Sequence, residues 1–137
     1  MCSVAEDDNP IEIDVAGMFG AIAQHGERFA IYVPSADRNE TSIDQRKWVE
    51  EALRLLSKIG GGATAMPPVD GAWLDPVTGR LIREQPIVVY SSVIPERFIE
   101  YGTELVSFVK RMGRETNQGA VAIEFDGRMY YVTDYSE

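Results

Sequence analysis

Four residues between positions 70 and 84 carry side chains that could hold a small ligand: Asp70, Trp73, Arg83 and Glu84. Proline and glycine within residues 75–79 indicate a tight turn, which would fold the chain on either side into a hairpin. The two carboxylates would lie near the ends of that hairpin, close to the arginine and beside the indole, as a polar cluster suited to a ligand. We predict that the ligand- or partner-binding residues are Thr64, Asp70, Trp73, Arg83, Glu84 and Tyr90.

This cluster has two competing interpretations. In an enzyme, Glu84 would act as a general base and Arg83 would stabilise developing charge. In a structural role, Trp73 would fill space in the core or at a sheet edge, and Glu84 would pair with an arginine on an exposed sheet face. We favour the structural interpretation and assign no catalytic residue from the sequence.

The other residue types exclude several kinds of site. Cys2 is the only cysteine, which rules out an intramolecular disulfide and a thiolate site for zinc. His25 is the only histidine, and its weakly patterned surroundings favour a surface or hinge position over a general base. Residues 60–62 are three glycines, but they follow an expected helix, whereas phosphate-binding loops precede one. We therefore expect no metal and no cofactor.

Composition and charge restrict the class of protein. The chain has 137 residues, of which 45% are hydrophobic and 26% charged, as in one folded soluble domain. Its net charge is -9, and residues 1–14 hold five acids and no Lys or Arg. This charge disfavours direct binding of nucleic acid, although an acidic inhibitor that mimics nucleic acid stays an alternative. No apolar run is long enough to cross a bilayer and the start does not resemble a signal peptide, so we expect a cytoplasmic protein.

The chain divides into an acidic arm with a short helix or loop, residues 1–27, and a single α+β domain, residues 28–137. Ile11, Ile13 and Val15 alternate with acids, which is typical of a half-buried strand or an extended arm. We expect residues 17–26 to form a short helix or loop that packs on the body.

The domain begins with a strand and a helix. Residues 28–33 are rich in β-branched and aromatic residues and end at a proline, which predicts a central strand. Ser42 and Gln45 match a capping box, and apolar residues at helical spacing follow from Trp48. Residues 60–62 would end this helix, since glycine adopts the left-handed conformation of a C-terminal cap.

Two strands, a helix and two further strands complete the domain. The return strand of the hairpin at residues 75–79 would run over residues 80–93, with Pro86 a candidate break. Pro95 would begin a helix that stops at Gly113. Residues 120–125 and 128–133 flank Asp-Gly, the strongest short-range signal of a hairpin.

This order of elements predicts a ferredoxin-like split βαβ fold with an extra C-terminal hairpin strand and two helices on one face of an antiparallel sheet. The other face would be left for a partner. Tyr90, Tyr130, Tyr131 and Tyr135 lie near strand ends, and alternation allows only one of Tyr130 and Tyr131 on that face. We predict a homodimer formed through the open face.

One pattern of Gly, Trp, Thr and Glu positions runs through most of the chain: Trp48, Gly61-Gly62-x-Thr64, Gly71-x-Trp73, Gly79, Glu84 and Gln118. In this pattern the chain resembles a family of small bacterial proteins built on a domain of unknown function. The similarity spans residues 28–133 and implies a shared fold. It implies no activity, because one fold hosts many functions.

Three hypotheses follow. The favoured one is a non-enzymatic binding or interaction module that holds a protein partner or a small ligand and is encoded with a mobile element or defence locus. The second is a small carboxylate-dependent enzyme with a pocket at Trp73, Arg83 and Glu84. The third is an acidic inhibitor that mimics nucleic acid.

Overall fold

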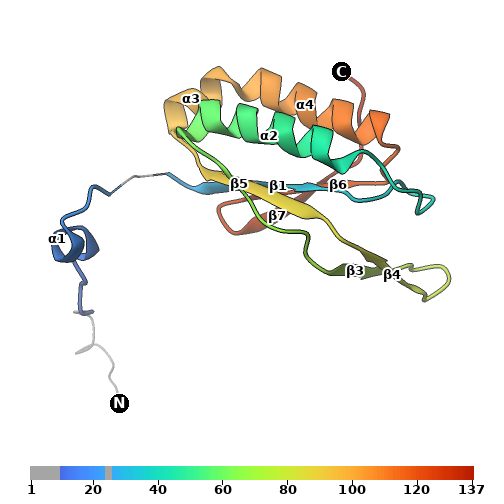
Figure 1. Cartoon of the computed structure of the whole chain (residues 1–137), viewed down its shortest axis with the longest axis horizontal. Coiled ribbons are helices and arrows are strands. Elements are labelled where there is room, and N and C mark those ends of the chain that lie inside the picture. Colours follow the sequence, from blue (N-terminus) through green and yellow to red (C-terminus); the bar gives the residue numbers. More distant parts are fainter. Residues whose placement is uncertain (1–9, 24–25) are drawn as a thin grey trace, which may run out of the picture.

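The computed structural model describes residues 10–23 and 26–137. Within them an antiparallel sheet of five strands is accompanied by a separate two-stranded hairpin and four helices (Figure 1), which confirms the α+β class. Cys2 and His25 lie outside the described residues. The elements are α1 (Val15–Phe19), β1 (Arg28–Val33), α2 (Gln45–Gly60), β2 (Thr64–Ala65), β3 (Gly71–Leu74), β4 (Leu81–Glu84), β5 (Ile87–Ser92), α3 (Pro95–Glu100), α4 (Gly102–Glu115), β6 (Val121–Phe125) and β7 (Arg128–Val132).

The strand order of the main sheet is β2-β5-β1-β6-β7, with antiparallel pairing between neighbours. The strand that follows α2 is therefore separated from β1 by β5, as a split βαβ plan requires. At the β6–β7 turn, Asp126 and Gly127 have φ values of 52° and 81°. Positive φ at both central residues is the geometry that an Asp-Gly hairpin turn adopts.

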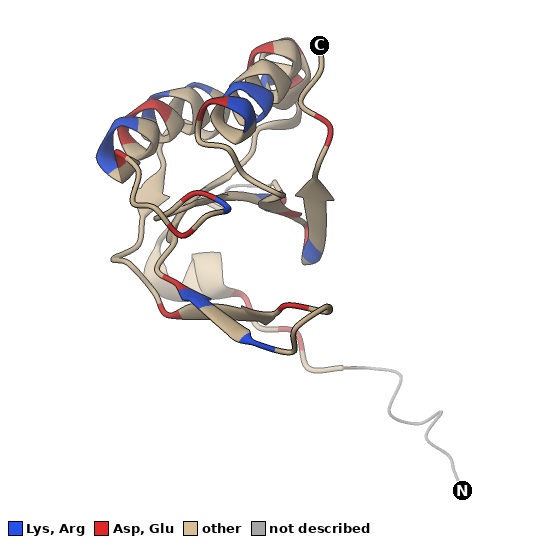
Figure 2. Cartoon of the chain, turned by 90° about the vertical axis from the view of Figure 1, so that its right-hand side faces the viewer, with Lys and Arg blue, Asp and Glu red and all other residues tan. Residues whose placement is uncertain are grey.

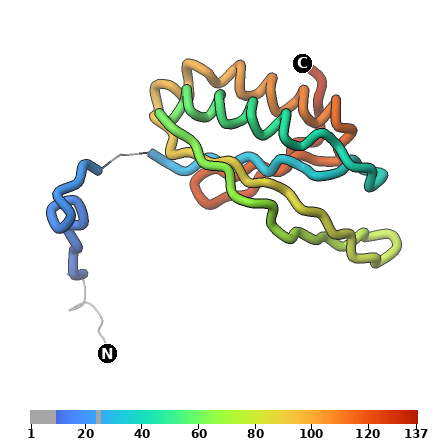
Figure 3. The backbone as a smooth tube through the Cα atoms, viewed as in Figure 1, coloured from blue at the N-terminus to red at the C-terminus, as the bar shows by residue number. Residues whose placement is uncertain are grey.

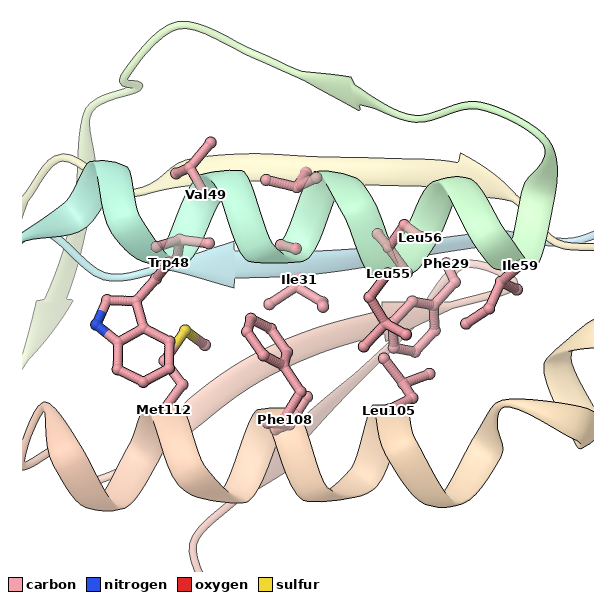
Figure 4. Close-up of a cluster of buried hydrophobic side chains, with 14 of the residues drawn as sticks. Phe29, Ile31, Trp48, Val49, Leu55, Leu56, Ile59, Leu105, Phe108 and Met112 are labelled. Carbon is pink, nitrogen blue, oxygen red and sulfur yellow. The ribbon is translucent and has the colours of Figure 1, made fainter.

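The core lies between the sheet and the pair formed by α2 and α4 (Figure 4). Alternation along β1 directs Phe29, Ile31 and Val33 to the helices, and all three are buried. Trp48 of α2 meets Phe108 of α4 with ring centroids 6.0 Å apart. Burial of this apolar surface is the main force that holds the helices on one face of the sheet.

The first turn of α2 differs from the prediction. Asp44, and not Ser42, is the N-terminal cap, because its carboxylate accepts from the Lys47 amide at 3.4 Å. Ser42 instead forms an isolated β-bridge with Ala36. The predicted end of the helix is confirmed, since Gly61 caps it with φ at 86°.

The helix predicted from Pro95 to Gly113 is two helices. It breaks at Tyr101, which ends α3 and precedes α4, and α4 continues past Gly113 to Glu115. The glycine serves packing rather than termination, because a Cβ there would overlap the Tyr135 ring.

The predicted hairpin forms, but it does not join the main sheet. β3 and β4 pair only with each other in the described part of the chain, and Figure 3 shows them extending beyond the end of the sheet. The strand expected over residues 80–93 breaks at Pro86, which separates β4 from β5. The short β2, which the sequence analysis did not predict as a separate strand, takes the edge position beside β5.

The described part of the N-terminal arm contains α1 and no strand. Its apolar side chains are exposed, with Ile11, Phe19 and Ile22 at 91%, 76% and 97%. The prediction that residues 17–26 pack on the body is therefore wrong for residues 17–23, and Figure 1 shows α1 standing apart. Gly26 does lie against the Val93 main chain. No helix in residues 10–23 or 26–137 has the length and apolarity needed to cross a membrane.

Candidate functional site

A polar cavity of about 370 Å³ lies where the β3–β4 hairpin meets the loop between β1 and α2. Three of the predicted site residues, Asp70, Arg83 and Glu84, line it. The sequence analysis did not foresee the other lining residues, which are Ser35, Ala36, Ser42, Gly71 and Gln85.

The loop side of the cavity is built by local hydrogen bonds. The Asp37 carboxylate accepts from the amides of Asn39 and Thr41 at 2.8 and 3.0 Å, which folds residues 37–41 into a tight turn. The bridge between Ala36 and Ser42 closes this turn. Gln118, next to β6, donates to the Ala36 carbonyl at 2.8 Å and fixes this wall to the body.

Three contacts join the hairpin to this loop and to the start of α2. The Gln85 amide donates to the Ser35 hydroxyl at 3.0 Å, and the Gln45 side-chain amide donates to the Gln85 carbonyl at 3.0 Å. At the far end of the hairpin, Arg80 forms an ion pair with Glu40 at 2.7 Å. This exposed pair lowers the pKa of Glu40, chiefly through the hydrogen bond from Arg80.

Glu84 is the principal chemical feature of the cavity. Its strand partner across the ladder is Gly71, which has no side chain to cover the carboxylate. Among the described residues no hydrogen bond or ion pair reaches this carboxylate, although the side chain is half-buried. Desolvation by burial raises the pKa of Glu84, because a carboxylate removed from water without a cation is costly to ionise.

Trp73 lies on the same face of the hairpin as Glu84. The register pairs Trp73 with Ile82 and Gly71 with Glu84, so Trp73 and Glu84 are diagonal neighbours, within reach for an aromatic side chain. Glu84 has no arginine partner in the described chain, so its predicted pairing with an arginine is wrong. Trp73 is 50% exposed and does not fill core space, but it does lie in a strand of a two-stranded sheet, as the sheet-edge alternative expected. Alternation along β4 turns the Arg83 side chain to the opposite face.

Thr64 and Tyr90 lie elsewhere. They face each other across the β2–β5 ladder on the main sheet, and neither lines the cavity. The Arg28 guanidinium lies 3.8 Å from the centroid of the Tyr90 ring, a cation–π contact. Of the six predicted residues, four therefore belong to the hairpin and the residue before it, and the other two, Thr64 and Tyr90, lie on the open face of the main sheet.

A larger groove of about 700 Å³ lies between α2 and α4. It is crossed by two ion pairs, Lys58 with Glu104 at 3.3 Å and Arg111 with Glu51. Four of its five charged residues are thus already paired, as expected of a solvated contact between two helices, and the fifth is Arg54. Each carboxylate of the groove therefore has a cation, whereas Glu84 has none among the described residues.

Within the described residues no three His, Cys, Asp or Glu side chains are grouped so as to hold a metal ion. The cavity is lined instead by two carboxylates, two serines, Gln85 and Arg83, and the indole of Trp73 lies nearby. The two acids outnumber the one base, and alternation places the Arg83 and Glu84 side chains on opposite faces of β4. Such a set favours a cationic ligand that also carries an aromatic ring or hydrogen-bonding groups.

No family model and no curated protein matches the chain. Solved structures of a phage SAM lyase share its fold. The lyase in complex with S-methyl-5'-thioadenosine matches with a TM-score of 0.59 and 15% identity, over 85% of this chain and 95% of that chain. The lyase in its apo state matches with a TM-score of 0.51 and 16% identity, over 85% of this chain and 99% of that chain.

Proposed function

We propose that the cavity beside Glu84 binds S-adenosylmethionine and that the chain is a lyase that splits it into 5'-methylthioadenosine and a four-carbon fragment. The observation that carries this proposal is the half-buried Glu84 carboxylate, which no cation contacts in the described chain. The fold shared with a phage SAM lyase supports the choice of ligand. At this identity the likeness shows fold alone, so the activity rests on experiment.

The chemistry of the ligand matches the cavity. S-adenosylmethionine carries a positive sulfonium centre, an ammonium group and an aromatic adenine. An unpaired carboxylate at Glu84 would attract the cation, and Asp70 lies on the same cavity wall. The exposed Trp73 ring on the same face of the hairpin can stack on the adenine or contact the cation.

In the proposed reaction the bond between the sulfonium sulfur and the γ-carbon of the methionine part breaks. Its electron pair passes to sulfur, which becomes the neutral thioether of 5'-methylthioadenosine. As the sulfur leaves, an oxygen of the substrate's own carboxylate bonds to the γ-carbon, which closes the four-carbon fragment into a lactone, and no water is consumed. The carboxylate of Glu84 binds and orients the cationic substrate. This role requires an ionised Glu84, so activity falls as the pH drops through the raised pKa of Glu84.

The test is to incubate the purified chain with S-adenosylmethionine and to follow both products by mass spectrometry. We expect turnover by the wild type and a loss of about 100-fold in kcat/KM for Glu84→Gln. Glu100→Gln, which removes the same charge from the exposed end of α3, is the matched control and should keep full activity. Absence of turnover in the wild type, or full activity in Glu84→Gln, would reject the proposal.

The second candidate is the non-enzymatic binding module. It is favoured by large exposed side chains on the hairpin and the open face of the sheet, such as Leu74 at 64% and Tyr131 at 65%. The same assay separates the two candidates, because a binding module would retain 5'-methylthioadenosine or S-adenosylmethionine in native mass spectrometry without converting either.

A further inference from the structure

Gln85, the residue after Glu84, has both main-chain polar groups held by side chains from a distant part of the chain. Its N–H donates to the Ser35 hydroxyl at 3.0 Å, and its carbonyl accepts from the Gln45 side-chain amide at 3.0 Å. The partners are separated by 50 and 40 positions in the sequence. We call these two bonds the Gln85 clamp.

Gln45 extends the clamp to the main sheet. Its Nε2 also donates to the carbonyl of Val33, the last residue of β1, at 3.1 Å. A side-chain amide has two N–H donors, and both are used here. Gln45 is itself the first residue of α2, so one side chain connects the end of β1, the start of α2 and the exit of β4.

The clamp acts where the hairpin has few other supports. β4 ends at Glu84 and β5 begins at Ile87, so two residues connect the hairpin to the main sheet on this side, and residues 66–70 connect it to β2 on the other. Pro86 has no N–H to donate, which leaves its carbonyl, bonded to the Val69 amide at 3.0 Å, as its main-chain contact. No ladder joins β3 or β4 to the five-stranded sheet in the described chain.

We propose that Ser35 and Gln45 are positioning residues, which hold the Gln85 main chain so that the Glu84 carboxylate stays against the cavity. The expected effect on catalysis rests on the proposed function. The expected effect on the position of Glu84 rests on the hydrogen bonds alone. Without the clamp the end of β4 can rotate, and the carboxylate moves from its half-buried position toward solvent. A displacement of this kind weakens an oriented contact with substrate.

Four variants of the full chain test the clamp. Gln45→Met removes both donors at similar side-chain size, and Ser35→Ala removes the acceptor for the Gln85 amide. Ser35→Thr keeps the hydroxyl and should restore the wild-type behaviour. Asp44→Ala is the matched control, because it removes a side-chain bond from the same end of α2 without touching Gln85.

Two readouts are compared, with thermal unfolding used to select conditions in which every variant is folded. The first is turnover of S-adenosylmethionine, for which Gln45→Met and Ser35→Ala should lower kcat by about tenfold and change KM less. The second is the pH titration of the Glu84 carboxyl carbon by NMR, whose midpoint should move down toward that of an exposed glutamate. Asp70 and Arg83 are the other charged residues of the cavity, and neither is substituted, so a shift reports the surroundings of Glu84.

The outcomes separate this inference from the proposed function. If the wild type shows no turnover, the lyase proposal fails, and the titration still decides whether the clamp places Glu84. The clamp proposal is overturned if Gln45→Met and Ser35→Ala leave the midpoint unchanged, or if Asp44→Ala moves it equally. It is also overturned if the two variants shift the midpoint while an active enzyme keeps its kcat, because the carboxylate position would then not matter for catalysis.

Discussion

Glu84 is unusual because its half-buried carboxylate has no cation or hydrogen-bond donor in the described chain. Burial raises the pKa of Glu84, so folding favours its protonated form. Protonated Glu84 therefore contributes to the free energy of unfolding. This contribution is fully present below the pKa that Glu84 has in the unfolded chain, and it is lost as the pH rises through the pKa of the folded state. At neutral pH the ionised Glu84 therefore lowers the stability of the folded protein.

Glu84→Gln should consequently raise the melting temperature by about 2 °C at about pH 7 and leave it nearly unchanged at about pH 3, where glutamate is protonated in both states. Thermal unfolding of both proteins across this range measures the difference. If Glu84→Gln instead lowers the melting temperature at neutral pH, the Glu84 carboxylate makes a stabilising contact, and its description as lacking a partner in the described chain is wrong.

At the scale of single residues, the sequence predicts the charged residues that line the candidate cavity and misses the other lining residues. Asp70, Arg83 and Glu84 were predictable because a local turn signal brings their strands together. Ser35 and Gln85 were not, because their bond spans 50 positions and no periodicity encodes it. Local patterns similarly assigned Ser42 to a helix cap, whereas tertiary contacts place it on the cavity wall.

At the scale of elements, α4 shows how a tertiary contact overrides a local signal. Gly113 looked like a helix stop, yet the helix passes it, and the ring of Tyr135 packs where a side chain would otherwise lie. The Tyr135 hydroxyl donates to the Gln118 carbonyl at 3.0 Å, which ties the C-terminal segment to the loop before β6. The β6–β7 hairpin was predictable from alternation and Asp-Gly, whereas β2 and the separation of the β3–β4 hairpin from the main sheet required the whole fold.

Gly113→Ala should destabilise the protein by about 1 to 3 kcal/mol, because the new methyl group would overlap the Tyr135 ring. In a Tyr135→Ala background the same substitution should cost little, since alanine suits a helix interior better than glycine. Chemical unfolding of the four proteins in this double-mutant cycle measures the coupling. Equal costs in both backgrounds would mean that the ring does not occupy this space.

Across the whole molecule, helices cover one face of the sheet and the hairpin extends from its end, so the candidate cavity forms at a junction rather than in the core. Figure 2 shows basic and acidic residues mixed along the helices. The homodimer through the open face and the absence of nucleic-acid binding stay predictions. The open face does carry Tyr131, which pairs with Ala122, and not Tyr130.

The central claim is that the cavity beside Glu84 receives an adenosyl sulfur compound. Titration of the ¹⁵N-labelled chain with 5'-methylthioadenosine, followed by amide NMR, tests it most directly. The account predicts saturable changes in the amide chemical shifts of the cavity residues, which are reduced in Glu84→Gln. These residues are Ser35, Ala36, Ser42, Asp70, Gly71, Arg83, Glu84 and Gln85. Saturable chemical-shift changes confined to the groove between α2 and α4, or no chemical-shift changes at all, would contradict this claim.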